Sequence, residues 1–105
     1  MNLSVSKTRE DDHNIGNDWI YITEINGEST TRNCTIMVGD VINLHAKFTE
    51  SDNNPDVGES YASHIVTEND LMNGFEVTLH VYVTENGGKN SGKTAHFVVI
   101  YMFTP

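Results

Sequence analysis

The residues best suited to chemistry in this 105-residue chain are acids that gather in two segments. One segment lies just before Trp19, and the other lies between Phe48 and Tyr61. Hard cations such as Ca²⁺ take about six to eight oxygens from carboxylates, amides and carbonyls on bendable loops. We therefore predict a Ca²⁺ site where the two segments meet. Its expected ligands are Asp11, Asp12, Asp18, Asp52 and Asp56, with Glu10, Glu50 and Asn54 as auxiliary ligands.

The spacing of the second segment limits the type of site. Asp52, Asn54 and Asp56 place oxygen-bearing side chains at alternate positions, as calcium loops often do. The segment is not an EF-hand, because Val57 stands where that loop needs Gly and Ser63 where it needs Glu. Acidic loops are also commonly just solvated, since Asp and Asn start turns by bonding their own backbone. A solvated loop is therefore the alternative to a metal site.

The two acidic segments resemble those of the synaptotagmin-type, calcium-dependent lipid-binding domains. The similar features are Glu10-Asp11-Asp12 with Asp18 ahead of the run from Trp19 to Ile22, and the segment from Phe48 to Gly58. In that family an Asp-rich strand end followed by an Asp and a Gly forms half of the calcium site. The resemblance covers roughly half of the chain and implies a calcium-binding β-sandwich. The family's basic lipid-contact strand has no counterpart in this sequence, so membrane docking is not implied.

The segment from Gly87 to Thr94 matches the phosphate-binding pattern G-x-x-x-x-G-K-[ST] at every position. In a nucleotide site this loop opens a helix, whose N-terminal amides hold the phosphates. Here Ala95 to Tyr101 is β-branched, aromatic and alternating, which predicts a strand instead. We therefore interpret the segment as a hairpin loop between the last two strands.

The histidines offer a second candidate metal site. His80 and His96 are both expected on the outer face of the last hairpin. They face each other if Val81 lies opposite Ala95, whereas a register shifted by two residues puts Val98 opposite His80. Facing histidines could share a zinc ion, although ordinary surface histidines are the simpler interpretation.

Composition excludes several classes of protein. Fifteen Asp and Glu against six Lys and Arg give a formal charge of -9, which excludes a nucleic-acid-binding protein. The longest apolar run, Phe97 to Phe103, is too short to cross a bilayer. Cys34, the single cysteine, is expected to be a small buried residue and excludes an internal disulfide. No Ser-His-Asp or Cys-His constellation is visible, so we do not expect an enzyme.

The size and the N-terminus indicate one domain over residues 1–105. The first residues are charged and contain no apolar h-region, so no signal peptide is expected. A cytoplasmic protein, or a domain excised from a larger protein, is the corresponding expectation for location.

Apolar residues recur with period two, which is typical of strands with one buried face. The clearest row is Phe75, Val77, Leu79, Val81 and Val83. Other strands are expected over residues 3–7, 19–25, 31–38, 42–48, 61–66 and 95–103, with a single helical turn at 67–72. This pattern predicts an all-β fold, an antiparallel sandwich of six to eight strands with immunoglobulin-like or related topology. The expected core residues are Trp19, Tyr21, Ile42, Leu44, Phe48, Phe75, Val77, Leu79, Val81, Phe97, Val99 and Tyr101.

The last strand is apolar on both faces, and its second row is Val98, Ile100 and Met102. Either the strand lies centrally and its second face is covered, or that face meets a partner. Two functions follow from the sequence. The first is a non-enzymatic Ca²⁺-binding module. The second is an immunoglobulin-like interaction or adhesion module without a metal, which self-associates or binds another protein through this row.

Overall fold

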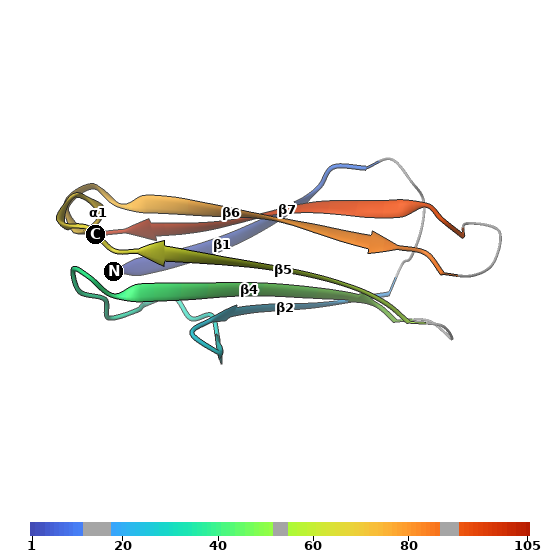
Figure 1. Cartoon of the computed structure of the whole chain (residues 1–105), viewed down its shortest axis with the longest axis horizontal. Helices are drawn as coiled ribbons and strands as arrows, with labels where there is room; N and C mark the ends of the chain where they lie inside the picture. The colour runs from blue at the N-terminus through green and yellow to red at the C-terminus, as the bar shows by residue number, and fades with distance from the viewer. Residues whose placement is uncertain (12–17, 52–54, 87–90) are drawn as a thin grey trace.

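The computed structural model describes residues 1–11, 18–51, 55–86 and 91–105. In this part of the chain two antiparallel sheets lie face to face (Figure 1). Sheet A has the strand order β1-β7-β6. Its strands are β1 (Asn2–Arg9), β6 (Phe75–Thr84) and β7 (Thr94–Thr104).

Sheet B has the strand order β3-β2-β4-β5. Its strands are β2 (Trp19–Ile25), β3 (Glu28–Ser29), β4 (Val41–Glu50) and β5 (Asp56–Ile65). The short helix α1 (Glu68–Asn73) joins β5 to β6, and Thr67 with Asp70 forms its capping box as expected from the sequence. The predicted all-β sandwich is therefore confirmed, with seven strands among the described residues.

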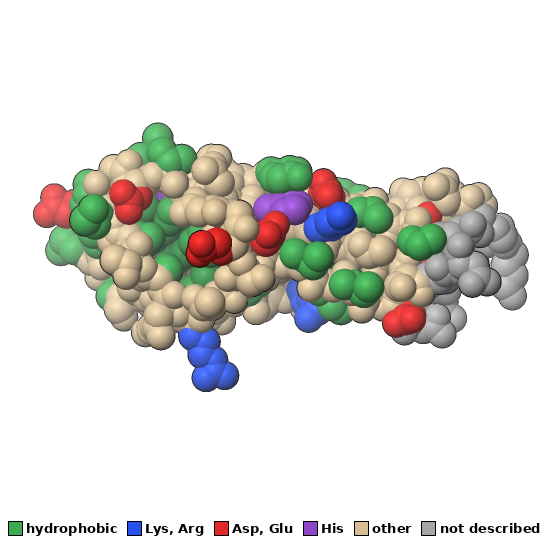
Figure 2. Space-filling model, turned by 90° about the horizontal axis from the view of Figure 1, so that it is seen from below, with side chains coloured by type: hydrophobic (Ala, Val, Ile, Leu, Met, Phe, Trp, Pro, Cys, Tyr) green, Lys and Arg blue, Asp and Glu red, His purple; other side chains and the backbone are tan. Residues whose placement is uncertain are grey.

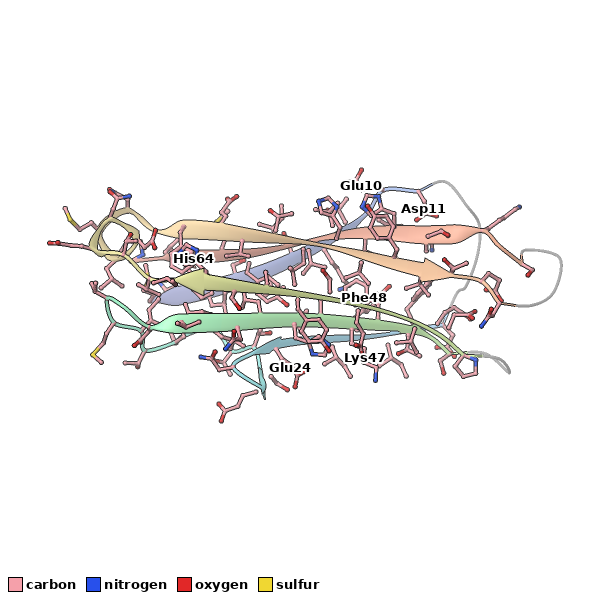
Figure 3. All side chains as sticks on the ribbon, viewed as in Figure 1. Glu10, Asp11, Glu24, Lys47, Phe48 and His64 are labelled. Carbon is pink, nitrogen blue, oxygen red and sulfur yellow. The ribbon has the colours of Figure 1, made fainter. Side chains whose placement is uncertain are left out.

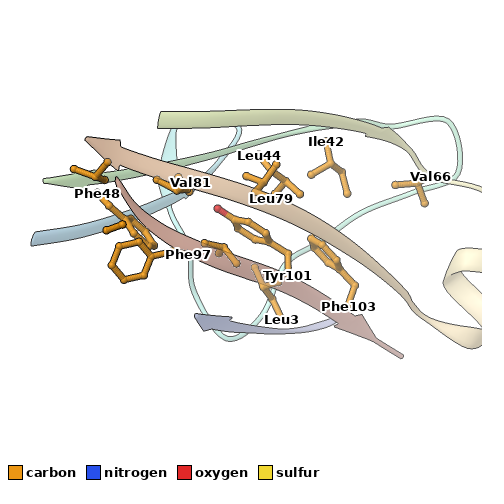
Figure 4. Close-up of a cluster of buried hydrophobic side chains, with 14 residues drawn as sticks. Leu3, Ile42, Leu44, Phe48, Val66, Leu79, Val81, Phe97, Tyr101 and Phe103 are labelled. Atoms are coloured by element: carbon orange, nitrogen blue, oxygen red, sulfur yellow. The ribbon is translucent and has the colours of Figure 1, made fainter. Parts of the chain in front are cut away.

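The core lies between the sheets and is built from alternate residues of each strand (Figure 4). In β4 the buried row begins at Ile42, and in β7 it runs from Ala95 to Phe103. Eight expected core residues are buried, and Trp19, Phe75 and Val77 pack against the cluster while partly exposed. Tyr21 was wrongly placed in the core, because 41% of its surface is exposed although its ring contacts Phe48 and Phe97.

The strand predicted over residues 31–38 is wrong. The segment forms one isolated bridge, Asn2 with Asn33, and hydrogen bonds to the start of β1 at Met1 and Leu3. The segment therefore runs beside the start of β1, but the pairing stops after one bridge and no regular strand forms. β-branched composition alone does not make a strand.

The last strand, β7, is central in sheet A, with β1 on one side and β6 on the other. Its outer row is not fully exposed, because Val98 and Ile100 are half-buried and Met102 is 41% exposed. The neighbours of Ile100 are Ser6 on β1 and Thr78 on β6, so short polar residues flank the middle of the row. Of the two hairpin registers considered, Val81 opposite Ala95 is wrong, and Val98 opposite His80 is right.

The sandwich is elongated, with principal extents of 51 × 23 × 19 Å. Both chain termini and α1 lie at one end (Figure 1). The outer face of sheet B, seen in Figure 2, mixes hydrophobic, acidic and basic side chains. Within the described part of the chain, no helix has the length and apolar character needed to cross a membrane.

Candidate metal centre

Three carboxylates converge at the end of the sandwich opposite the termini. They belong to Glu50 at the last position of β4, Asp56 at the first position of β5, and Glu85 just after β6. Their ligand oxygens all lie within 4.8 Å of one another. Among the described residues this is the one group of three or more His, Cys, Asp or Glu with metal-binding spacing. Sheet B supplies two of the three carboxylates, and the chain leaving sheet A supplies the third.

The alternation of each strand explains why these acids point inward. In β4 the buried row ends at Glu50, two residues after Phe48. In β6 the buried row reaches Val83, and Glu85 comes two residues later. Because side chains alternate along a strand, an acid in phase with the core row points between the sheets. Asp56 lies on the inner side of β5 and is the register partner of Glu50.

A close approach of β5 and β6 brings the third carboxylate to the other two. Gly58 is buried, and a Cβ atom built on it would overlap the carbonyl oxygen of Tyr82. Only a residue without a side chain lets the two backbones come this near. Asp56 lies two residues before this contact and Glu85 three residues after it, so the strand ends carry both acids to one place.

The site is largely shielded from water. Glu50 is 3% exposed and Asp56 is 4% exposed, while Glu85 is half-buried. Oδ2 of Asp56 is buried and has no hydrogen-bond partner among the described residues. Buried carboxylates this close together repel one another, and an unsatisfied buried oxygen carries the full cost of desolvation. A cation among them would compensate both costs.

The three carboxylates are close enough to share one cation. Ca²⁺ binds oxygens at about 2.3–2.6 Å and Mg²⁺ at about 2.0–2.1 Å. Because all three ligand oxygens lie within 4.8 Å of one another, a single divalent ion between them could reach every carboxylate.

The structure brings together only some of the ligands expected from the sequence. Glu50 and Asp56 are in the three-carboxylate cluster. Asp18 lies at the same end, since its carbonyl accepts a hydrogen bond of 2.7 Å from the Ser51 amide, but its side chain is exposed. Asp12, Asp52 and Asn54 lie outside the described residues.

Asp11 and Glu10 lie instead beside His96 (Figure 3). The Arg9 guanidinium binds both oxygens of Asp11, at 3.0 and 3.2 Å, and the His96 amide donates to Oδ1 at 2.9 Å. Burial opposes ionisation of Asp11, but these donors outweigh it and lower the pKa of its carboxyl group. Asp11 is therefore held by protein donors, apart from the cluster.

Glu85 is the member of the cluster that the sequence did not predict. It stands alone beyond the strand, outside both acidic segments, so local acid density gave no signal. The signal that could have found Glu85 is its position in the alternation. It comes two residues after Val83 and so continues the buried row of Leu79, Val81 and Val83.

The segment after the glycine-rich loop is a strand, as predicted. Ser91 and Gly92 form a turn, β7 starts at Thr94, and the Glu85 amide donates to the Lys93 carbonyl at 2.8 Å. The described part of this segment therefore closes a hairpin, and residues 87–90 lie outside the described residues.

Comparisons with known proteins find no matching family model, and no curated protein or solved structure is significantly similar to this chain. The resemblance to synaptotagmin-type domains accordingly stays a prediction.

Proposed function

We propose that this protein is a non-enzymatic Ca²⁺-binding β-sandwich module whose ion is held by Glu50, Asp56 and Glu85. The observation that carries the proposal is the buried Asp56 oxygen without a partner among the described residues, inside a cluster of three carboxylates. Carboxylates can bind Ca²⁺ through one or both oxygens, and water and backbone carbonyls can complete the coordination.

Ion binding would link the two sheets at one end of the sandwich. Glu50 and Asp56 lie on sheet B, whereas Glu85 follows β6 of sheet A. Without a cation, repulsion among the carboxylates favours separation of the strand ends. With Ca²⁺ bound, the same groups tie the sheets together at this end, so the ion would stiffen it and order what adjoins it.

The direct test is thermal unfolding at low salt in EDTA, in millimolar Ca²⁺ and in millimolar Mg²⁺. A ligand at about 100 times its Kd stabilises the folded state by about 2.7 kcal/mol. For a domain of this size that corresponds to a rise in Tm on the order of 10 °C. We expect this rise with Ca²⁺ and a much smaller one with Mg²⁺.

The matched variants are Glu85→Gln, which removes one ligand charge, and Glu76→Gln, which removes an exposed charge on the outer side of β6. Glu85→Gln should lose most of the Ca²⁺-dependent rise, and Glu76→Gln should keep it. An unchanged Tm of the parent protein in Ca²⁺, or a full rise in Glu85→Gln, would contradict the proposal.

The interaction module without a metal is the less supported function. The observation that supports it is the apolar outer row of β7, where Met102 is 41% exposed and Val98 and Ile100 are half-buried. The backbone of β7 is already paired on both sides, so only the side chains of this row could contact a partner. Sedimentation of the parent protein and of Ile100→Lys tests it: concentration-dependent assembly that the substitution abolishes would favour this function.

A further inference from the structure

The outer face of sheet A carries two histidines whose rings meet across neighbouring strands. His80 lies on β6 and His96 on β7, diagonally placed because Val98 is opposite His80 and Tyr82 is opposite His96. Nδ1 of His80 and Nε2 of His96 lie 2.9 Å apart. His80 is exposed and His96 half-exposed, so both rings are open to solutes.

Neighbouring groups hold the two rings in place. The Tyr82 ring stacks on His96 with centroids 4.5 Å apart and an interplanar angle of 13°. The backbone of His96 is fixed from the β1 side, since its amide donates to Asp11 and its carbonyl accepts from the Glu10 amide at 2.8 Å. A pair of ring nitrogens fixed on two paired strands needs little reorganisation to bind a common ion.

We propose that His80 and His96 bind a divalent transition-metal ion of the Zn²⁺, Ni²⁺ or Cu²⁺ class. Imidazole nitrogens bind these ions at about 2.0–2.1 Å. Two such nitrogens at a right angle about the metal lie roughly 2.9 Å apart, and at a tetrahedral angle roughly 3.4 Å apart. The two nitrogens are joined by a hydrogen bond of 2.9 Å, so an ion would replace the shared proton and each ring would turn to point its lone pair at the ion.

Glu10 is an exposed carboxylate on the β1 side of His96, and it would contribute negative charge near the ion rather than a ligand atom. It follows Arg9, the register partner of Phe97, and so lies across from His96 on the β1 side. Glu10 is exposed, and Figure 3 shows it beside Asp11 on the outer side of sheet A. A carboxylate there would offset the charge of the bound ion, and water would fill the remaining positions.

This site is independent of the three-carboxylate cluster. It uses nitrogen ligands on the outer face of sheet A, whereas Glu50, Asp56 and Glu85 offer only oxygens at the end of the sandwich. The two sites therefore prefer different ions, and the proposal for one site can be wrong while the proposal for the other is right.

The test is calorimetric titration of the folded protein with Zn²⁺ and Ni²⁺ at neutral pH. We expect one ion to bind, and we expect His80→Asn and His96→Asn each to weaken binding by more than the roughly 10- to 100-fold that loss of an outer partner costs. Glu10→Gln should weaken it less. The controls are His64→Gln, a histidine of sheet B, and Glu85→Gln, and both should bind as the parent does.

A second measurement needs no variant. Sub-stoichiometric Cu²⁺ should broaden the ring proton signals of His80 and His96 before those of His45 and His64. Absence of binding by the parent protein, full binding by His80→Asn or His96→Asn, loss of binding in Glu85→Gln, or broadening at other histidines first would each overturn the proposal.

Discussion

Asp11 and Asp56 show two ways in which a buried carboxylate can be compensated. Asp11 receives its compensation from the protein, since Arg9 and the His96 amide donate to it. Asp56 is 4% exposed and one of its oxygens has no partner among the described residues. The first carboxylate therefore needs no ion, whereas the second lies where an ion would lower the free energy of the folded state.

Tyr101 is a residue whose chemistry is changed by burial. It is 0% exposed, and its hydroxyl donates to the His45 carbonyl at 2.9 Å, which joins β7 of sheet A to β4 of sheet B. Burial, with a smaller contribution from Glu24, raises the pKa of Tyr101 to about 12. The unfolded chain ionises tyrosine near pH 10. The stability contributed by neutral Tyr101 is therefore present below about pH 10 and is lost as the pH rises toward 12.

We predict that Tyr101 titrates last of the four tyrosines, together with alkaline unfolding, when near-ultraviolet absorbance is followed against pH. Tyr101→Phe should remove this late titration and should lower the free energy of unfolding at neutral pH by about 1 kcal/mol, because one hydrogen bond is lost. Tyr82→Phe, at an exposed position, is the control. A late titration that persists in Tyr101→Phe would contradict the assignment.

At the scale of elements, the contact of β5 with β6 decides whether the carboxylates meet. β5 starts at Asp56, five residues before the predicted strand at 61–66, and the added residues include Gly58. Gly58 lies in this added part of the strand and faces the backbone of Tyr82. Its function in the fold is to let two strands from different sheets approach.

We predict that Gly58→Ala destabilises the protein, because the new methyl group would overlap the Tyr82 carbonyl and crowd Val83. Overpacking of this kind costs about 1–3 kcal/mol, and sometimes more. Denaturant unfolding measures the loss, and the Ca²⁺-dependent rise in Tm should shrink with it. Ser60→Ala, on the same face of β5, adds no atoms and should cost less. Equal stability of the two variants would show that the strands do not approach closely there.

At the scale of the whole molecule, charge is the dominant feature. The formal charge is -9 on a sandwich only 23 by 19 Å across, so exposed carboxylates repel one another over the entire surface. Such repulsion acts at long range, and any salt screens it.

We predict that choline chloride stabilises the metal-free protein. Raising ionic strength from about 0.01 M to about 0.1 M shortens the screening length from about 30 Å to about 10 Å. The expected gain is roughly 0.5–1 kcal/mol, or a few degrees in Tm measured in EDTA. The proposed Ca²⁺ effect should persist at the higher salt, because salt screens buried carboxylates much less than exposed ones. A constant or falling Tm with choline chloride would show that surface repulsion is unimportant.

The sequence alone determined the features that depend on local order. Alternation located β4, β6 and β7, β-branched and aromatic composition located β2, and the helical turn expected at 67–72 lies where α1 forms. Alternation works because a half-buried strand must place every second side chain on the core. The same alternation indicates that Glu50 and Glu85 point toward the core, because each lies two residues after a buried strand residue. Only Glu50 was among the ligands predicted from the sequence.

Tertiary structure decided everything that depends on which strands become neighbours. The segment at 31–38 has β-branched residues, but its pairing with β1 ends after one bridge, so it is not a strand. The sequence allowed two registers of β6 with β7 that differ by two residues, because both keep the same side chains facing the core. Glu85 joins Glu50 and Asp56 only because β5 and β6 touch at Gly58. Residues far apart in the chain become one site through packing, which no local pattern specifies.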